Sequence, residues 1–156
     1  MEQKTKIQAE EGKQEIFIKR EFDLPIELLF RAYTEPKFVE EWMGTKVVKL
    51  ESKKQGAYQF ETKDVNGNIL LQSSGVIHDL VVNEKITRTF EMENTPFPAQ
   101  LEYLEFEQLT ENTSKLTMQV VYKSVTDRDA ILKLPFAFGI NMAHNKLQDT
   151  LNKLIK

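Results

Sequence analysis

The chain contains no cysteine among its 156 residues. Disulfide bonds, thiolate metal ligands and cysteine nucleophiles are therefore excluded. The chain also lacks an excess of positive charge, because it has 21 lysines and arginines against 24 aspartates and glutamates, a net charge of −3. No basic cluster interleaves with aromatic residues, so we expect no nucleic-acid partner.

Long hydrophobic runs are missing as well. No apolar stretch approaches the roughly 18 residues that a membrane-spanning helix needs. The opening residues Met1-Glu2-Gln3-Lys4 do not begin a signal peptide. We therefore expect a cytoplasmic protein without a membrane contact.

Motifs for metal, phosphate and nucleophilic chemistry are absent. Neither His78 nor His144 has a neighbour at metal-ligand spacing, so no metal is expected. Each histidine is expected at the surface or in a structural role, with general acid–base chemistry as the alternative. The chain has no GxSxG, GxxxxGK[ST] or GxGxxG pattern, so no cofactor is expected. These absences favour binding over catalysis without deciding between them.

What is present is an ordinary globular composition, with 40% apolar and 29% charged residues. Polar residues 1–13 are expected to form a loose tail, and residues 14–156 a single domain. Alternating apolar and polar residues predict seven strands, over Glu15–Phe22, Val47–Glu51, Ala57–Lys63, Ile69–Leu80, Lys85–Met92, Gln100–Leu109 and Ser114–Tyr122.

Helical spacing occurs in two places. After the first strand, Pro25 begins one short helix, and Asp23 is expected to cap it by accepting from its free N–H groups. Thr34-Glu35-Pro36 begins a second short helix that ends at Gly44. Near the end of the chain, apolar residues recur at steps of three and four, at Leu132, Phe136, Ile140, Ala143, Leu147, Leu151 and Leu154. This spacing predicts a helix over Asp127–Ile155, capped by Thr126 and kinked at Pro135.

Consecutive strands with short turns make an antiparallel sheet, and an amphipathic helix of this length needs a large surface to cover. The predicted fold class is α+β, a helix-grip arrangement. In it, a seven-stranded curved antiparallel sheet surrounds a long C-terminal helix, with two short helices between the first and second strands.

Several segments resemble a known family. The block Glu15–Pro36 followed by Trp42 is similar to the opening of the Hsp90-ATPase-activator-homologue group, within the START-like (Bet v 1-like, SRPBCC) superfamily. The resemblance extends over about residues 14–155, through Gly56-Ala57-Tyr58, Asn66-Gly67, Gly75, Glu84-Lys85-Ile86, Arg128–Leu132, Gly139, Ala143, Leu147 and Leu151. It implies the same helix-grip fold, in which cavities between sheet and helix are common.

The last helix departs from the family pattern. Pro135-Phe136 and Gly139-Ile140 stand where the family usually has Gly-Met pairs. Both changes would reshape a cavity, so a relative's ligand does not carry over.

Alternation along the strands predicts which of their side chains face the helix, and the last helix adds its sheet-facing residues, with Trp42 at the rim. The candidate ligand-binding residues are mostly aromatic or otherwise apolar, with one arginine among them: Trp42, Tyr58, Phe60, Arg88, Phe90, Phe106, Met118, Phe136 and Ile140. Such a lining suits a small hydrophobic molecule. The alternative is that the same side chains simply fill the core.

Arg88 is the exceptional member of this set. It lies between Ile86 and Phe90 on an apolar face, where an unpaired charge is costly. It either binds a carboxylate or phenolate of a ligand, or pairs with an inward acid such as Glu102, or lies exposed at the edge of the sheet.

Three functions follow from these observations. The first is non-enzymatic binding of a small hydrophobic or aromatic molecule, by a monomer or a homodimer. The resemblance implies a second, interaction with an Hsp90-type chaperone. It also implies a third, a polyketide cyclase or aromatase-like enzyme using Arg88, His144 and Tyr122.

Overall fold

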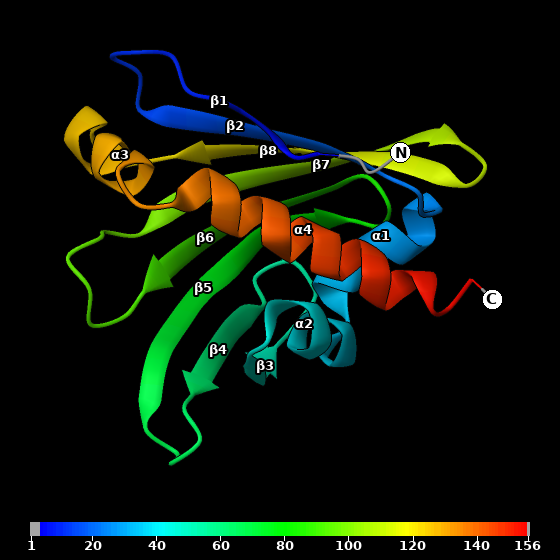
Figure 1. The fold of residues 1–156 in the computed structure, drawn as a ribbon, viewed down its shortest axis with the longest axis horizontal. Helices are drawn as coiled ribbons and strands as arrows, with labels where there is room; N and C mark the ends of the chain where they lie inside the picture. The colour runs from blue at the N-terminus through cyan, green and yellow to red at the C-terminus, as the bar shows by residue number, and fades with distance from the viewer. Residues whose placement is uncertain (1–3, 156) are drawn as a thin grey trace.

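The computed structural model describes residues 4–155. Over these residues the chain forms eight strands and four helices (Figure 1). The strands are β1 (Lys6–Gln8), β2 (Glu15–Phe22), β3 (Lys46–Leu50), β4 (Ala57–Lys63), β5 (Ile69–Val81), β6 (Lys85–Met92), β7 (Gln100–Thr110) and β8 (Thr113–Val121). The helices are α1 (Ile26–Thr34), α2 (Pro36–Met43), α3 (Val125–Leu132) and α4 (Phe136–Asn152).

All strands belong to one antiparallel sheet in the order β1-β2-β8-β7-β6-β5-β4-β3. Helix α4 crosses one face of this sheet, and α1 and α2 lie beside its C-terminal half (Figure 1). The predicted α+β, helix-grip arrangement is confirmed, and so are the two short helices after Glu15–Phe22. The predicted strand boundaries agree with the observed ones to within one residue.

The predicted number of seven strands is wrong. The additional strand, β1, falls in the stretch that the sequence predicts as a loose tail, and Ile7 pairs with Ile18 of β2. A strand of three residues with a single apolar side chain is too short to show alternation. Long-range pairing with β2 determines its conformation instead.

The predicted single C-terminal helix is two helices, separated at residues 133–135. Pro135 has no N–H to donate and restricts the residue before it, so the helix ends instead of bending. The predicted caps are also wrong. Ser124, and not Thr126, caps α3, because its hydroxyl accepts from the Asp127 N–H at 3.0 Å. At α1, Asp23 makes no capping hydrogen bond. No helix among residues 4–155 is long and apolar enough to span a bilayer.

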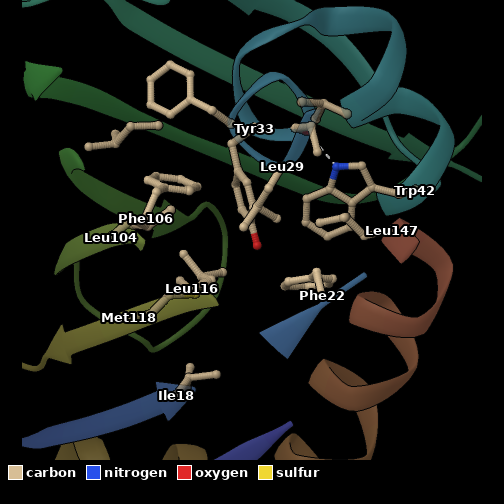
Figure 2. Close-up of a cluster of buried hydrophobic side chains, with 14 of the residues drawn as sticks. Ile18, Phe22, Leu29, Tyr33, Trp42, Leu104, Phe106, Leu116, Met118 and Leu147 are labelled. Carbon is tan, nitrogen blue, oxygen red and sulfur yellow. Dashed lines mark hydrogen bonds between the residues drawn. The ribbon is translucent and has the colours of Figure 1, made fainter. Parts of the chain in front are cut away.

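The core lies between the sheet and the helices. Leu147 and Leu151 of α4 are fully buried, whereas Leu154 at the end of the predicted stripe is 47% exposed. Figure 2 shows side chains from α1 and α2 facing those of the central strands. Trp42 of α2 donates its indole N–H to the Ala32 carbonyl at 2.7 Å, which fixes α2 against α1.

The two edge strands of the sheet are short. β3 carries Lys46 and Lys49, and its pairing with β4 is interrupted by a bulge between Val47 and Lys49. At the opposite edge, β1 has three residues and begins at Lys6.

Candidate ligand pocket

A cavity of about 280 Å³ lies between the sheet and helices α2 and α4. Most of its wall is apolar, and the polar side chains come mainly from β6 and β7. The lining residues are Ile18, Tyr33, Val39, Trp42, Met43, Phe60, Arg88, Phe90, Gln100, Glu102, Met118, Val120, Tyr122, Phe136, Ile140 and Ala143. Other hollows at the surface are lined largely by lysine and glutamate side chains and do not suit an apolar molecule.

Helix α4 supplies one wall through residues spaced three and four apart. Phe136, Ile140 and Ala143 lie on the same side of the helix and face the sheet. Ala143 has the smallest of these side chains and leaves space beside the two larger ones. Met43 of α2 also lines the cavity and is 41% exposed, so it lies where the cavity meets the surface.

Seven of the nine predicted site residues line the cavity: Trp42, Phe60, Arg88, Phe90, Met118, Phe136 and Ile140. These seven side chains therefore lie on the faces that the sequence pattern indicated, and their role in binding stays a prediction. The alternative of a completely filled interior does not describe this region.

The other two predicted residues, Tyr58 and Phe106, pack outside the lining. The ring of Tyr58 lies 5.2 Å from that of Phe60, and its hydroxyl donates to the Thr89 carbonyl. Phe106 makes edge contacts with Phe30 and Tyr33, at centroid distances of 5.1 and 5.8 Å. Alternation places both side chains on the correct face, but contacts with neighbouring aromatic rings direct them away from the space.

The polar end of the cavity is organised around an ion pair. Arg88 Nε donates to Glu102 Oε1 at 2.9 Å, and the side chains are only 13% and 6% exposed. Gln100 Nε2 donates to the other oxygen, Glu102 Oε2, at 2.8 Å. The Arg88 guanidinium also lies over the Tyr58 ring, 5.4 Å from its centroid. Of the alternatives for Arg88, pairing with Glu102 is confirmed, and Arg88 faces the cavity at the same time.

Arg88 keeps its positive charge within this pair. Burial lowers the pKa of the guanidinium, but Tyr58 and Glu102 raise it by more, so the net pKa is above its ordinary value. Such a buried pair is favourable only when additional hydrogen bonds satisfy its atoms, and Gln100 supplies one of them.

Two tyrosine hydroxyls complete the polar end. Tyr33 of α1 and Tyr122, which follows β8, both line the cavity. Within the described part of the chain neither hydroxyl makes a hydrogen bond. Burial raises the pKa of both hydroxyls well above the ordinary value, so they remain protonated. Figure 2 shows the Tyr33 hydroxyl directed from its helix toward the interior of the cluster.

Sequence reasoning did not select several lining residues, among them Tyr33, Val39 and Gln100. Tyr33 belongs to the predicted apolar side of the first short helix. That pattern indicates that the side chain is buried, but not that it faces the cavity. Gln100 begins its strand, where alternation is weakest. The pairing of Arg88 with Glu102 in register across β6 and β7 was the available signal for the polar end.

The three residues suggested for an enzyme do not meet. Arg88 and Tyr122 line the cavity, but His144 is absent from the lining. It is fully buried, with Nδ1 2.7 Å from the Thr5 hydroxyl and its ring edge-on to Phe22. Burial, with a smaller contribution from Arg20, lowers the pKa of His144 to about 3. Among residues 4–155 no cluster of His, Asp or Glu side chains could hold a metal ion.

Comparison with known proteins assigns the chain to a family. The family described as "Activator of Hsp90 ATPase homolog 1-like protein" matches residues 23–152. The chain belongs to this family. The matched segment begins directly after β2 and includes all four helices and the strands from β3 to β8. It therefore covers every element that surrounds the cavity except β2.

Several solved structures share the fold of this chain. A crystal structure of a Rhodobacter sphaeroides protein is 20% identical, with a TM-score of 0.82 over 96% of this chain and 99% of the other. A Mycobacterium smegmatis protein is 16% identical, with a TM-score of 0.81 over 94% and 95%. A solution structure from Staphylococcus epidermidis is 19% identical, with a TM-score of 0.80 over 96% and 95%. No curated protein matches the chain.

Proposed function

We propose that this activator-homolog family protein binds a small hydrophobic or aromatic molecule in the cavity between the sheet and α4. The supporting observation is the cavity of about 280 Å³ itself, because the default for a protein interior is close packing without a space of this size. Its volume is near the lower end of the range, about 300–1,000 Å³, typical of pockets for small molecules.

The composition of the wall supports an apolar guest. Phe60, Phe90, Phe136 and Trp42 contribute aromatic surface, and Met43 and Met118 contribute flexible thioethers that adapt to different shapes. The polar groups gather at Arg88 and its neighbours instead of being distributed along the wall. This arrangement suits a molecule with an apolar body and few polar atoms.

Filling the cavity from α4 tests the proposal. Ala143→Leu places three more carbon atoms in the cavity without removing an existing contact. We expect it to weaken binding of 2-methylnaphthalene at least about tenfold, since each lost 1.4 kcal/mol of contact is a tenfold change. Stability should be equal or higher, because the added side chain fills a space. Binding is measured by quenching of Trp42, the single tryptophan of the chain, which lines the cavity.

Ala137→Leu is the matched control. Ala137 is exposed on the same helix and does not line the cavity, so the same substitution should leave binding unchanged. If Ala143→Leu binds the probe as well as the original chain does, or if both variants lose binding equally, the cavity is not the binding site.

A further inference from the structure

The polar end of the cavity carries no net charge although it contains an arginine. Glu102 compensates Arg88 directly, and Gln100 holds the second carboxylate oxygen. The remaining polar groups, the hydroxyls of Tyr33 and Tyr122, are neutral at any ordinary pH because burial keeps their pKa high. A guest therefore meets a site that is rich in hydrogen-bond groups and electrically balanced.

This end of the cavity also has hydrogen-bonding capacity that the protein does not use. Arg88 bonds Glu102 only through Nε, and within residues 4–155 its two terminal nitrogens make no hydrogen bond. The hydroxyls of Tyr33 and Tyr122 are unused in the same sense. All three side chains line the cavity. Unused donors at a buried position favour a partner that brings an acceptor atom.

An anionic head is a poor partner here. A ligand carboxylate would share the single cation with Glu102 and leave one buried negative charge uncompensated. Taking a charge out of water is costly unless it is fully paired, and like charges in a buried site repel strongly. A neutral oxygen accepts the same hydrogen bonds without this penalty.

On these grounds, and resting on the proposed function, we infer that the natural ligand is an uncharged molecule with an apolar body and one hydroxyl or carbonyl oxygen. That oxygen accepts a hydrogen bond from a terminal N–H of Arg88, and the Tyr33 and Tyr122 hydroxyls are available to an additional polar atom. Glu102 acts as a filter against carboxylates. The class includes phenols, alcohols and ketones and excludes free fatty acids and other organic acids.

Three probes with one aromatic body test the inference, namely 2-methylnaphthalene, 2-naphthol and 2-naphthoate, titrated calorimetrically at pH 7. We expect 2-naphthol to bind at least about tenfold more tightly than either of the others, the equivalent of one well-placed hydrogen bond. Failure of all three to bind overturns the proposed function and this inference with it. Equal binding of 2-methylnaphthalene and 2-naphthol, or tightest binding of 2-naphthoate, leaves apolar binding intact and overturns the neutral-head inference alone.

Removing the negative charge of Glu102 gives a second, independent test of the inference. Glu102→Gln keeps an acceptor for Arg88 Nε and removes the negative charge, so it should move the preference toward 2-naphthoate at least about tenfold relative to 2-naphthol. Glu105→Gln is the control, because Glu105 lies on the same strand with its side chain on the exposed face. An equal change of preference in both variants would assign the effect to overall charge and refute the filter.

The double variant Arg88→Met/Glu102→Met removes both charges together, which avoids leaving one buried charge unpaired. It should bind 2-methylnaphthalene as the original chain does and lose the advantage of 2-naphthol. An undiminished preference for 2-naphthol in this folded variant would also refute the inference.

Discussion

Gly75 permits a close approach of strands and side chains in the sheet beside the cavity. It pairs with Tyr58 across β4 and β5, and a Cβ atom added there would lie 2.0 Å from the Thr89 carbonyl oxygen and 2.6 Å from the Tyr58 ring. The Tyr58 ring in turn supports the Arg88 guanidinium. The absence of a side chain at Gly75 on β5 therefore helps to position the charged group of Arg88 on the neighbouring strand β6.

Substitution of Gly75 by alanine is expected to lower the free energy of unfolding by about 1–3 kcal/mol, the usual cost of overpacking. Gly139→Ala is the opposite case, because nothing lies within 4 Å of an added Cβ there and glycine is unfavourable inside a helix. It should raise the free energy of unfolding by about 0.5–1 kcal/mol. Urea unfolding measures both, and a stabilising Gly75→Ala would show that Tyr58 moves freely.

His144 gives the protein an acid-sensitive component of stability. The unfolded chain protonates this histidine below its ordinary pKa of about 6.5, whereas the folded chain resists protonation down to a pKa of about 3. Its contribution is therefore complete above pH 6.5 and is lost progressively as the pH falls from there toward 3. Between pH 7 and 5 the loss is on the order of 2 kcal/mol.

Comparison of the original chain with His144→Asn isolates this contribution. The variant should be less stable at pH 7, because Asn does not fill the space of the ring, but its stability should fall less between pH 7 and 5. Urea unfolding at both pH values measures the difference. Equal slopes in the two proteins would mean that His144 takes up a proton as readily in the folded chain as in the unfolded chain.

At the scale of elements, Thr5, the residue directly before β1, is attached to side chains of α4. Asn141 Oδ1 accepts from the Thr5 backbone N–H at 3.0 Å and from Arg20 at 3.3 Å, and the Thr5 hydroxyl contacts His144. Residues more than 130 positions apart thereby join the first strand to the last helix. The attachment complements the backbone pairing of β1 with β2.

Asn141→Ala should loosen this attachment locally. The substitution leaves the Thr5 N–H without an acceptor, at a cost of about 1–3 kcal/mol. We expect faster hydrogen exchange for the amides of Lys6–Gln8 and little change for those of Lys85–Met92, measured by NMR. Uniformly faster exchange throughout the sheet would contradict a local role.

The elements themselves were largely predictable, for a physical reason. In a sheet with one face against the core, alternate residues of the sequence are buried, as in Thr113–Val121. A proline and a glycine mark the two ends of α2. The break between α3 and α4 was less accessible, because Pro135 predicts either a kink or an end and tertiary packing selects between them. The strand β1 is specified by its partner β2 and by α4, which local periodicity does not reveal.

At the scale of the whole molecule, the sequence predicted on which face of the sheet the candidate site lies, but not which residues line it. Alternation placed Phe60, Arg88 and Met118 toward the helix, and the cavity lies there. Alternation could not distinguish side chains that line the cavity from side chains that pack beside it. The direction of Tyr58 depends on its contact with Phe60, and that of Phe106 on its contacts with Phe30 and Tyr33. The polar end required three-dimensional proximity of side chains from α1, β6, β7 and the residue after β8.

Binding in the cavity would stabilise the whole fold, since α4, α2 and the sheet would each contact the guest. At a free 2-naphthol concentration of about 100 times its Kd, the free energy of unfolding should rise by about 2.7 kcal/mol. Urea unfolding with and without the probe measures the change. Ala143→Leu, with at least about tenfold weaker binding, should gain no more than about 1.4 kcal/mol at the same concentration, whereas an equal rise in both proteins would indicate binding elsewhere.

The edges of the sheet also have a consequence for how chains meet one another. An open sheet offers unpaired backbone groups along its outermost strands, and these can recruit further strands into fibres. Here the bulge between Val47 and Lys49 interrupts one edge, lysines line it, and the opposite edge is only three residues long. The outermost strands are thus poor templates for fibril growth, although the inner face of the same sheet borders a cavity.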